Sequence, residues 1–138
     1  MLAARLAVAV VALGAIGWLA VMERDARLYE RGIAAGGRLD DARTVARAEA
    51  DLEGARLLSP DRTPDVGRSL VLWTSGRAAE ARALLEDVVR SEPDNLSAWT
   101  ALVWVNDGED PALERRVRAQ MRRLDPLSGG RPPPPPAR

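Results

Sequence analysis

The chain has 138 residues, which suits one compact domain with an appendage, and its 20 basic and 20 acidic residues leave it without net charge. It contains neither Cys nor His, which excludes a Cys/His zinc site, a thiol nucleophile and a histidine general base. The balanced charge also argues against electrostatic steering toward nucleic acid, so no nucleic-acid partner is expected.

Residues 6–22 form an uncharged run that is apolar on every face of a helix. About 20 helical residues cross the hydrocarbon core of a bilayer. The apolar residues 2–4 complete that length, because the long side chain of Arg5 can reach the headgroups. Trp18 lies near the far end, where tryptophan is common at membrane interfaces. We therefore predict a transmembrane anchor over residues 1–24.

A cleaved signal peptide is the main alternative to this anchor, but no clean pair of small residues follows the apolar core as a cleavage site. The position of the segment favours a signal anchor that exports the C-terminal part of the chain. The basic residues Arg24, Arg27 and Arg31 favour the opposite orientation. We expect a single-pass protein of a bacterial cytoplasmic membrane with the rest of the chain extracytoplasmic, and a cytoplasmic domain is the alternative.

Residues 25–126 carry a pattern that repeats every 33 residues. Pro60, Pro93 and Pro126 each close a similar phrase, and each follows an amphipathic stretch that proline ends. When the units are aligned on these prolines, small and apolar residues coincide: Ala48 with Ala81, Leu52 with Leu85, and Ala55 with Val88 and Met121. A period of this length predicts stacked helical hairpins.

Each repeat is expected to hold two helices joined by a turn. In the first unit the pattern favours helices over residues 25–35 and 39–58, separated by two glycines. In the second unit the first helix starts at Asp65 and the second follows a turn at Gly76. The second helix has an apolar face with spacings of three and four residues, formed by Ala81, Leu84, Leu85 and Val88.

The third unit has the same plan. Its first helix begins after a capping residue, Asp94 or Asn95, and its second follows Gly108 with Pro111 at the opening. Cations surround the apolar stripe of this last helix, so we expect it to cap the array with a polar outer face. The stripe comprises Leu113, Val117, Met121 and Leu124, and the cations are Arg115, Arg116, Arg118, Arg122 and Arg123.

The stretch from residue 76 to residue 102, GRAAEARALLEDVVRSEPDNLSAWTAL, resembles the tetratricopeptide repeat family. The matching features are the turn glycine, a small residue at a close helix crossing, a bulky apolar residue, a closing proline and an opening tryptophan: Gly76, Ala81, Leu85, Pro93 and Trp99. The resemblance spans residues 28–126, although Glu114 and Arg118 stand where the family has apolar residues. It implies an all-α fold in which a transmembrane helix precedes a short right-handed α-solenoid of about three hairpins, over residues 25–126.

By the geometry of the family, the first helix of each hairpin lines a concave groove. The residues expected to face this groove are Leu70, Thr74, Thr100 and Trp104, whereas those expected between helices are Val66, Trp73, Trp99 and Leu102. Trp104 is the candidate anchor for a partner, because rigid aromatic side chains in grooves are frequent binding hot spots. An ordinary core tryptophan is the alternative interpretation of this residue.

The densest carboxylates lie in the first unit. Glu49 and Glu53 are four residues apart, but they have no companion histidine and no calcium-loop spacing. Their alternation with Arg43, Arg47 and Arg56 favours a solvated, salt-bridged helix face. We therefore expect neither a metal nor a cofactor.

Residues 127–138 contain two adjacent glycines and five consecutive prolines, and they have too few apolar side chains for a core. We predict a disordered tail with polyproline II character. Such a segment is a ligand for a proline-binding groove, a spacer, or an end without a partner.

The leading functional interpretation is a membrane-anchored adaptor that binds a protein or peptide partner near the bilayer. It is not expected to be an enzyme, because the sequence has no phosphate loop, nucleophile elbow or dinucleotide fingerprint. Two alternatives stay open. In the first alternative, the chain is an accessory structural subunit of a membrane complex. In the second, its Arg-rich last helix binds anionic lipid or nucleic acid.

Overall fold

The computed structural model describes residues 23, 27, 42–57 and 59–135, which form helices joined by turns. The helices are α2 (Ala42–Arg56), α3 (Thr63–Thr74), α4 (Ala78–Ser91), α5 (Leu96–Asn106), α6 (Pro111–Leu124) and the short 3-10 helix η1 (Pro126–Ser128). The predicted all-α class is confirmed. The predicted anchor and the helix expected over residues 25–35 lie outside the described residues, apart from residues 23 and 27. Among the helices that are described, none has the length and apolarity to cross a membrane.

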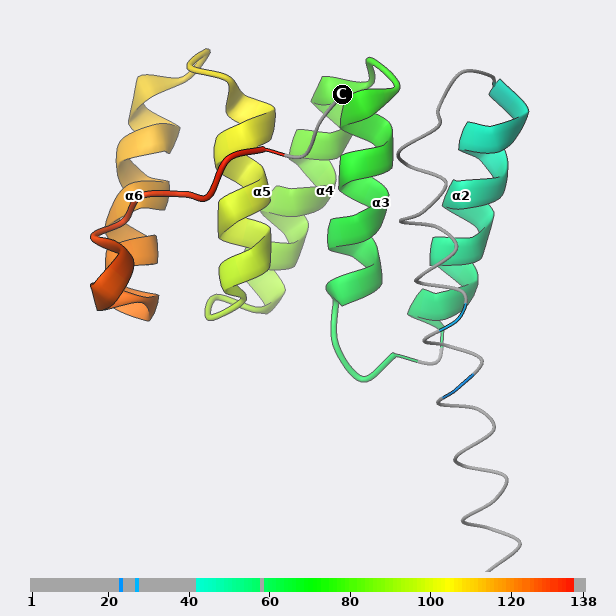
Figure 1. Cartoon of the computed structure of the whole chain (residues 1–138), viewed down its shortest axis with the longest axis horizontal. Coiled ribbons are helices and arrows are strands. Elements are labelled where there is room, and N and C mark those ends of the chain that lie inside the picture. Colours follow the sequence, from blue (N-terminus) through cyan, green and yellow to red (C-terminus); the bar gives the residue numbers. More distant parts are fainter. Residues whose placement is uncertain (1–22, 24–26, 28–41, 58, 136–138) are drawn as a thin grey trace, which may run out of the picture.

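The helices stack in series from α2 to α6 (Figure 1). Each one packs against the next along the chain, and α3 also packs against α5. In Figure 1, α3 and α5 lie in front of α4, so the first helices of successive hairpins share one layer. This layer forms the face that the sequence predicts to bind a partner.

The burial pattern matches the 33-residue period. Pro60, Pro93 and Pro126 follow the ends of α2, α4 and α6. The residues that coincide when the repeat units are aligned on these prolines are all buried: Ala48, Leu52, Ala55, Ala81, Leu85, Val88 and Met121. The four residues expected between helices are buried as well: Val66, Trp73, Trp99 and Leu102. The core residues predicted from the repeat are therefore confirmed.

Two side-chain caps fix where helices of the third hairpin begin. The Oδ1 atom of Asn95 accepts a hydrogen bond, 3.0 Å long, from the backbone N–H three residues on, so Asn95 rather than Asp94 caps α5. Asp110 caps α6 by accepting hydrogen bonds from the backbone N–H groups of Leu113 and Ala112, at 3.1 and 2.8 Å. These two donors hold the pKa of the Asp110 carboxyl below its usual range, because they stabilise its charged form.

α6 closes the described array with a narrow apolar stripe. Its buried residues Leu113, Val117 and Met121 lie four apart on one face, and its five arginines are exposed, as expected of a cap. Glu114 and Arg118 form an ion pair, with 2.6 Å between Oε1 and Nη2, at positions that α4 fills with buried apolar residues. α4 packs against both α3 and α5, whereas α6 packs against α5 and the short η1. The charged pair is tolerated because α6 has one large helix neighbour rather than two.

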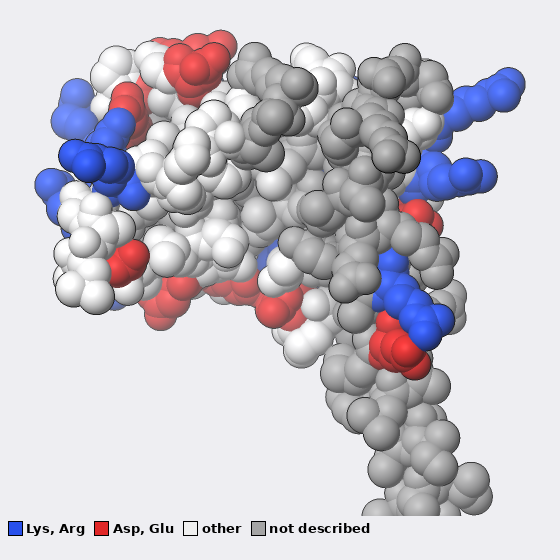
Figure 2. Space-filling model, in the orientation of Figure 1, with Lys and Arg blue, Asp and Glu red and all other residues white. Residues whose placement is uncertain are grey.

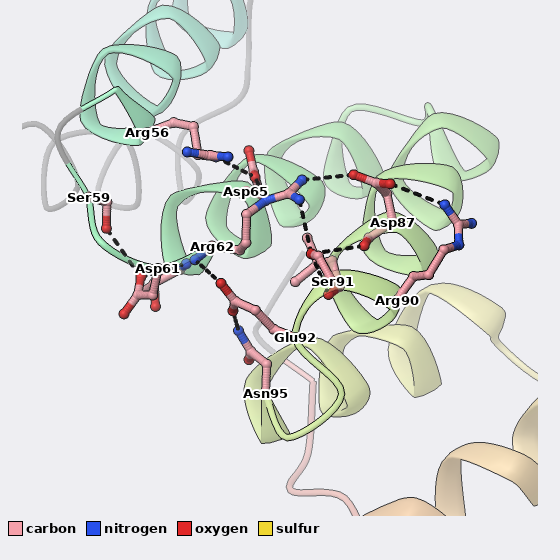
Figure 3. Close-up of polar contacts among 12 residues, drawn as sticks. Arg56, Ser59, Asp61, Arg62, Asp65, Asp87, Arg90, Ser91, Glu92 and Asn95 are labelled. Atoms are coloured by element: carbon pink, nitrogen blue, oxygen red, sulfur yellow. Dashed lines mark hydrogen bonds and ion pairs between the residues drawn. The ribbon is translucent and has the colours of Figure 1, made fainter.

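A polar cluster centred on Arg62 joins α2, α3 and α4 (Figure 3). Arg62 precedes α3, and its guanidinium donates to the carboxylates of Asp65 and, at 3.0 Å, Asp87. The backbone N–H of Arg62 donates to Glu92 at 2.9 Å, and Arg56 at the end of α2 donates to Asp65 at 2.9 Å. Burial disfavours the charge on Arg62, but the carboxylates outweigh this effect and raise the pKa of its guanidinium. The cluster thus holds the loop between α2 and α3 against α4.

α2 joins the stack through a small apolar cluster that is separate from the main core and consists of Ala48, Leu52 and Val71. The helix ends at Arg56, before the predicted end at residue 58. The Glu49 carboxylate lies 2.6 Å from Nη1 of Arg77 in the turn between α3 and α4. The salt-bridged face expected from the charges of this helix therefore reaches across to the next hairpin.

Candidate functional site

The four residues predicted to face a groove lie in different surroundings on α3 and α5. The hydroxyl of Thr74 donates to the backbone carbonyl of Leu70 at 2.8 Å, and both side chains are partly buried. Thr100 is buried, with 8% of its surface exposed. Trp104 is partly buried, packs against the main core and donates a hydrogen bond away from it. Of the four, Trp104 is the residue that lines a cavity over these helices.

The cavity has a volume of about 680 Å³ and lies over the C-terminal ends of α3 and α5. One wall comes from these two helix ends, the turn after α5 and the first turns of α6. The opposite wall is the proline-rich tail, residues 132–135. The residues of the helical wall are Trp73, Val103, Trp104, Asp107, Gly108 and Glu114. The site therefore combines two tryptophans with two carboxylates.

The tail reaches this cavity through a reversal of the chain after η1. The sequence predicts a disordered tail over residues 127–138. In the structure residues 129–135 run back across α6 and α5, and residues 136–138 lie outside the description (Figure 1). Gly129 and Gly130 make the reversal with φ values of 62° and 76°, a region that side chains disfavour. Gly130 is buried against α6, where a Cβ atom would lie 2.8 Å from the carbonyl oxygen of Arg118.

One hydrogen bond fastens the tail to α5. The indole Nε1–H of Trp104 donates to the backbone carbonyl of Pro133 at 2.9 Å. Trp99, which lies on the same helix, donates its own indole N–H to Pro93 at 2.8 Å, but that contact belongs to the turn between α4 and α5. The two tryptophans therefore make the same chemical contact in two places, and only the one at Trp104 involves the tail.

The surface over α5 and the tail is largely uncharged. In Figure 2, uncharged side chains cover the area over α5 and the tail, whereas arginine side chains gather toward the α6 end and the α2 end of the stack. Asp107 and Glu114 add negative charge beside the cavity, and Glu114 accepts hydrogen bonds from Arg118. A ligand for this surface would be uncharged along most of its length.

The arginines of α6 are partly neutralised by neighbouring carboxylates. Arg118 pairs with Glu114, and Arg123 lies 2.6 Å from Asp94 in the turn before α5. Within the described ranges, no group of three or more acidic side chains is placed to hold a metal ion.

The comparisons with family models, curated proteins and solved structures find no match to this chain. Sequence reasoning singled out Trp104 and the proline run separately, and it missed that they meet. It also missed Val103, Asp107 and Glu114 as cavity residues. The sequence feature that could have indicated this contact is the glycine pair after the last helix. Adjacent glycines allow a chain to turn back over the helix that precedes them.

Proposed function

We propose that the protein is a membrane-anchored adaptor whose stacked hairpins, similar to tetratricopeptide repeats, dock a segment of a partner protein. The observation that carries this proposal is the proline-rich segment lying across α5 and bonded through its backbone to Trp104. A surface that accepts one extended segment through a backbone carbonyl has the chemistry to accept another. The stacked arrangement of the helices and the uncharged surface over α5 and the tail support the same interpretation.

The apolar run over residues 6–22 would hold this docking surface at a bacterial cytoplasmic membrane, with the stacked helices on the extracytoplasmic side. Tethering both the adaptor and its partner near one bilayer raises their local concentration, so a modest affinity is enough for association. In this mechanism the protein has no catalytic step. Its output is the position of the partner.

The full chain is expected to stay with the membrane fraction through alkaline carbonate extraction, because the apolar run spans the bilayer. A variant without residues 2–22 is expected to move to the supernatant. Arg5→Gln is the matched control and should stay in the pellet, since it leaves the apolar run intact. Extraction of the full chain, or retention of the deletion variant, would contradict the anchor.

A photoreactive amino acid placed at Val103, which lines the cavity, is expected to form a crosslink to one partner protein in the native membrane. The control position is Arg90 on α4, whose side chain is 73% exposed and takes no part in the cavity. Crosslinks at residue 103 that are absent at residue 90 support docking on the α3–α5 face, which is the face of the layer formed by these two helices. Equal crosslinking at both positions, or none at residue 103, argues against it. Crosslinking at both positions to subunits of fixed stoichiometry would favour an accessory subunit of a larger complex.

A further inference from the structure

We propose that the α3–α5 face is a binding groove for proline-rich segments, and that residues 131–135 of the chain occupy it in cis and compete with the partner's segment. This inference rests on the proposed docking function and names the chemistry of its ligand. It has three supports: the hydrogen bond at Trp104, the geometry of the chain reversal and the composition of the cavity.

The first support is the match between donor and acceptor. Proline has no backbone N–H, and a polyproline II segment makes no internal hydrogen bonds, so its carbonyls remain available to a binding surface. The indole N–H of Trp104 supplies one donor to Pro133, at 2.9 Å. Aromatic grooves that recognise proline-rich segments exploit a ligand of this kind, because fixed φ angles leave little entropy to lose on binding.

The second support is the way in which the chain delivers its own tail. Gly129 and Gly130 both adopt positive φ, and Gly130 lies so close to α6 that a Cβ atom would meet both the carbonyl of Arg118 and the side chain of Arg122. Asp125 caps η1 just before, by accepting hydrogen bonds from the backbone N–H groups of residues 127 and 128. A tail directed in this way reaches the groove without a long flexible linker.

The third support is the space that the cavity still offers beside the tail. A volume of about 680 Å³ remains open between residues 132–135 and the helices, lined by Trp73 and Trp104. Asp107 and Glu114 also line it. Two tryptophans beside an open volume suit the packing of further proline rings.

The cis arrangement sets the strength of the competition. A segment joined by a short linker has an effective concentration on the order of millimolar. An outside segment of the same composition must displace it, so its apparent affinity equals its intrinsic affinity multiplied by the fraction of molecules in which the groove is open. Removing the tail should therefore strengthen binding of a proline-rich ligand in trans.

The test compares the full chain in detergent with a variant that ends at Gly130, using a fluorescent peptide of the sequence of residues 131–138, RPPPPPAR. Fluorescence polarisation should give an affinity at least about tenfold higher for the truncated variant. A control peptide with alanine in place of the prolines, RAAAAAAR, should bind the truncated variant at least about tenfold more weakly than the proline peptide. Equal affinity of the two protein forms, or of the two peptides, would overturn the proposal.

A matched pair of substitutions in the truncated variant isolates the indole donor. Trp104→Phe should weaken binding of the proline peptide about fivefold, because it removes one hydrogen bond and keeps an aromatic ring. Trp99→Phe removes the equivalent bond to Pro93 outside the groove and should leave peptide affinity unchanged when circular dichroism shows a folded protein. An equal loss for both variants would mean that the bond at Trp104 acts through stability alone and would overturn its role in recognition.

Two further outcomes separate this inference from the docking function. If the full chain dimerises with rising concentration and the variant that ends at Gly130 does not, the tail binds a second copy. This result would overturn its cis role. If the proline peptide does not bind but crosslinks at residue 103 persist, docking stands and the ligand chemistry proposed here is wrong. If the crosslinks are missing too, the docking function itself fails.

Discussion

Replacing Leu85 with Ala is expected to lower the free energy of unfolding by about 3 kcal/mol. Leu85 is fully buried on α4, and α4 packs against both α3 and α5. The substitution removes apolar contacts and leaves a cavity at the point where two hairpins share their core. A small repeat array has little stability in reserve, because each hairpin buries its apolar face only against a neighbour. Urea denaturation of the purified full chain, followed by circular dichroism, measures the change.

Leu127→Ala provides the matched control, because it makes the same chemical change at a side chain that is 99% exposed. It should alter the free energy of unfolding by no more than about 0.5 kcal/mol. If the two substitutions had similar effects, Leu85 would not lie in a shared core and the stacked arrangement would be wrong.

The helices and their core could be predicted from the sequence because both depend on local periodicity. Apolar residues three and four apart mark the buried face of a helix, and proline marks where it ends. The 33-residue period then assigns equivalent positions, which is why Ala81 and Leu85 of α4 are buried like Ala48 and Leu52 of α2. Glu114 departs from this pattern, because it places a charge at the position that Ala81 fills in α4. The explanation lies in the tertiary packing, since α6 has fewer helix neighbours than α4.

The candidate site was predictable only in part. The resemblance to tetratricopeptide repeats singled out Trp104 as a groove residue. It also assigned Thr100 to the groove, but this side chain is buried. The contact between Trp104 and Pro133 joins residues that are far apart in sequence and that no repeat relates. It depends on the backbone angles of Gly129 and Gly130, which a composition of glycine and proline permits without dictating. Periodicity therefore predicts the scaffold, while a single chain reversal decides which segment covers the face formed by α3 and α5.

The choice between two neighbouring caps was also left open by the sequence. Asp94 and Asn95 both belong to the residue types that cap helices. The structure selects Asn95, whose side chain meets the first turn of α5, while Asp94 pairs with Arg123 of α6. That pairing depends on tertiary packing, so it could not be derived from local preference.

Replacing Asp65 with Asn is expected to lower the free energy of unfolding by about 2 kcal/mol. Asp65 is 6% exposed and accepts hydrogen bonds from the guanidinium groups of both Arg56 and Arg62 (Figure 3). The substitution removes the one negative charge between two cations and keeps the shape of the side chain. Arg56 is partly exposed and Arg62 retains Asp87, so the effect is smaller than for a fully enclosed pair. Urea denaturation at neutral pH gives the free energy.

Asp94→Asn makes the same substitution in an ion pair at the surface. The side chains of Asp94 and Arg123 are 79% and 60% exposed, so water already solvates both charges and the pair contributes at most about 0.5 kcal/mol. A difference between the two variants therefore measures how burial strengthens an ion pair in this fold. If Asp65→Asn were as mild as Asp94→Asn, the cluster around Arg62 would not hold α2 to the stack, and the small apolar contact of α2 would have to do so alone.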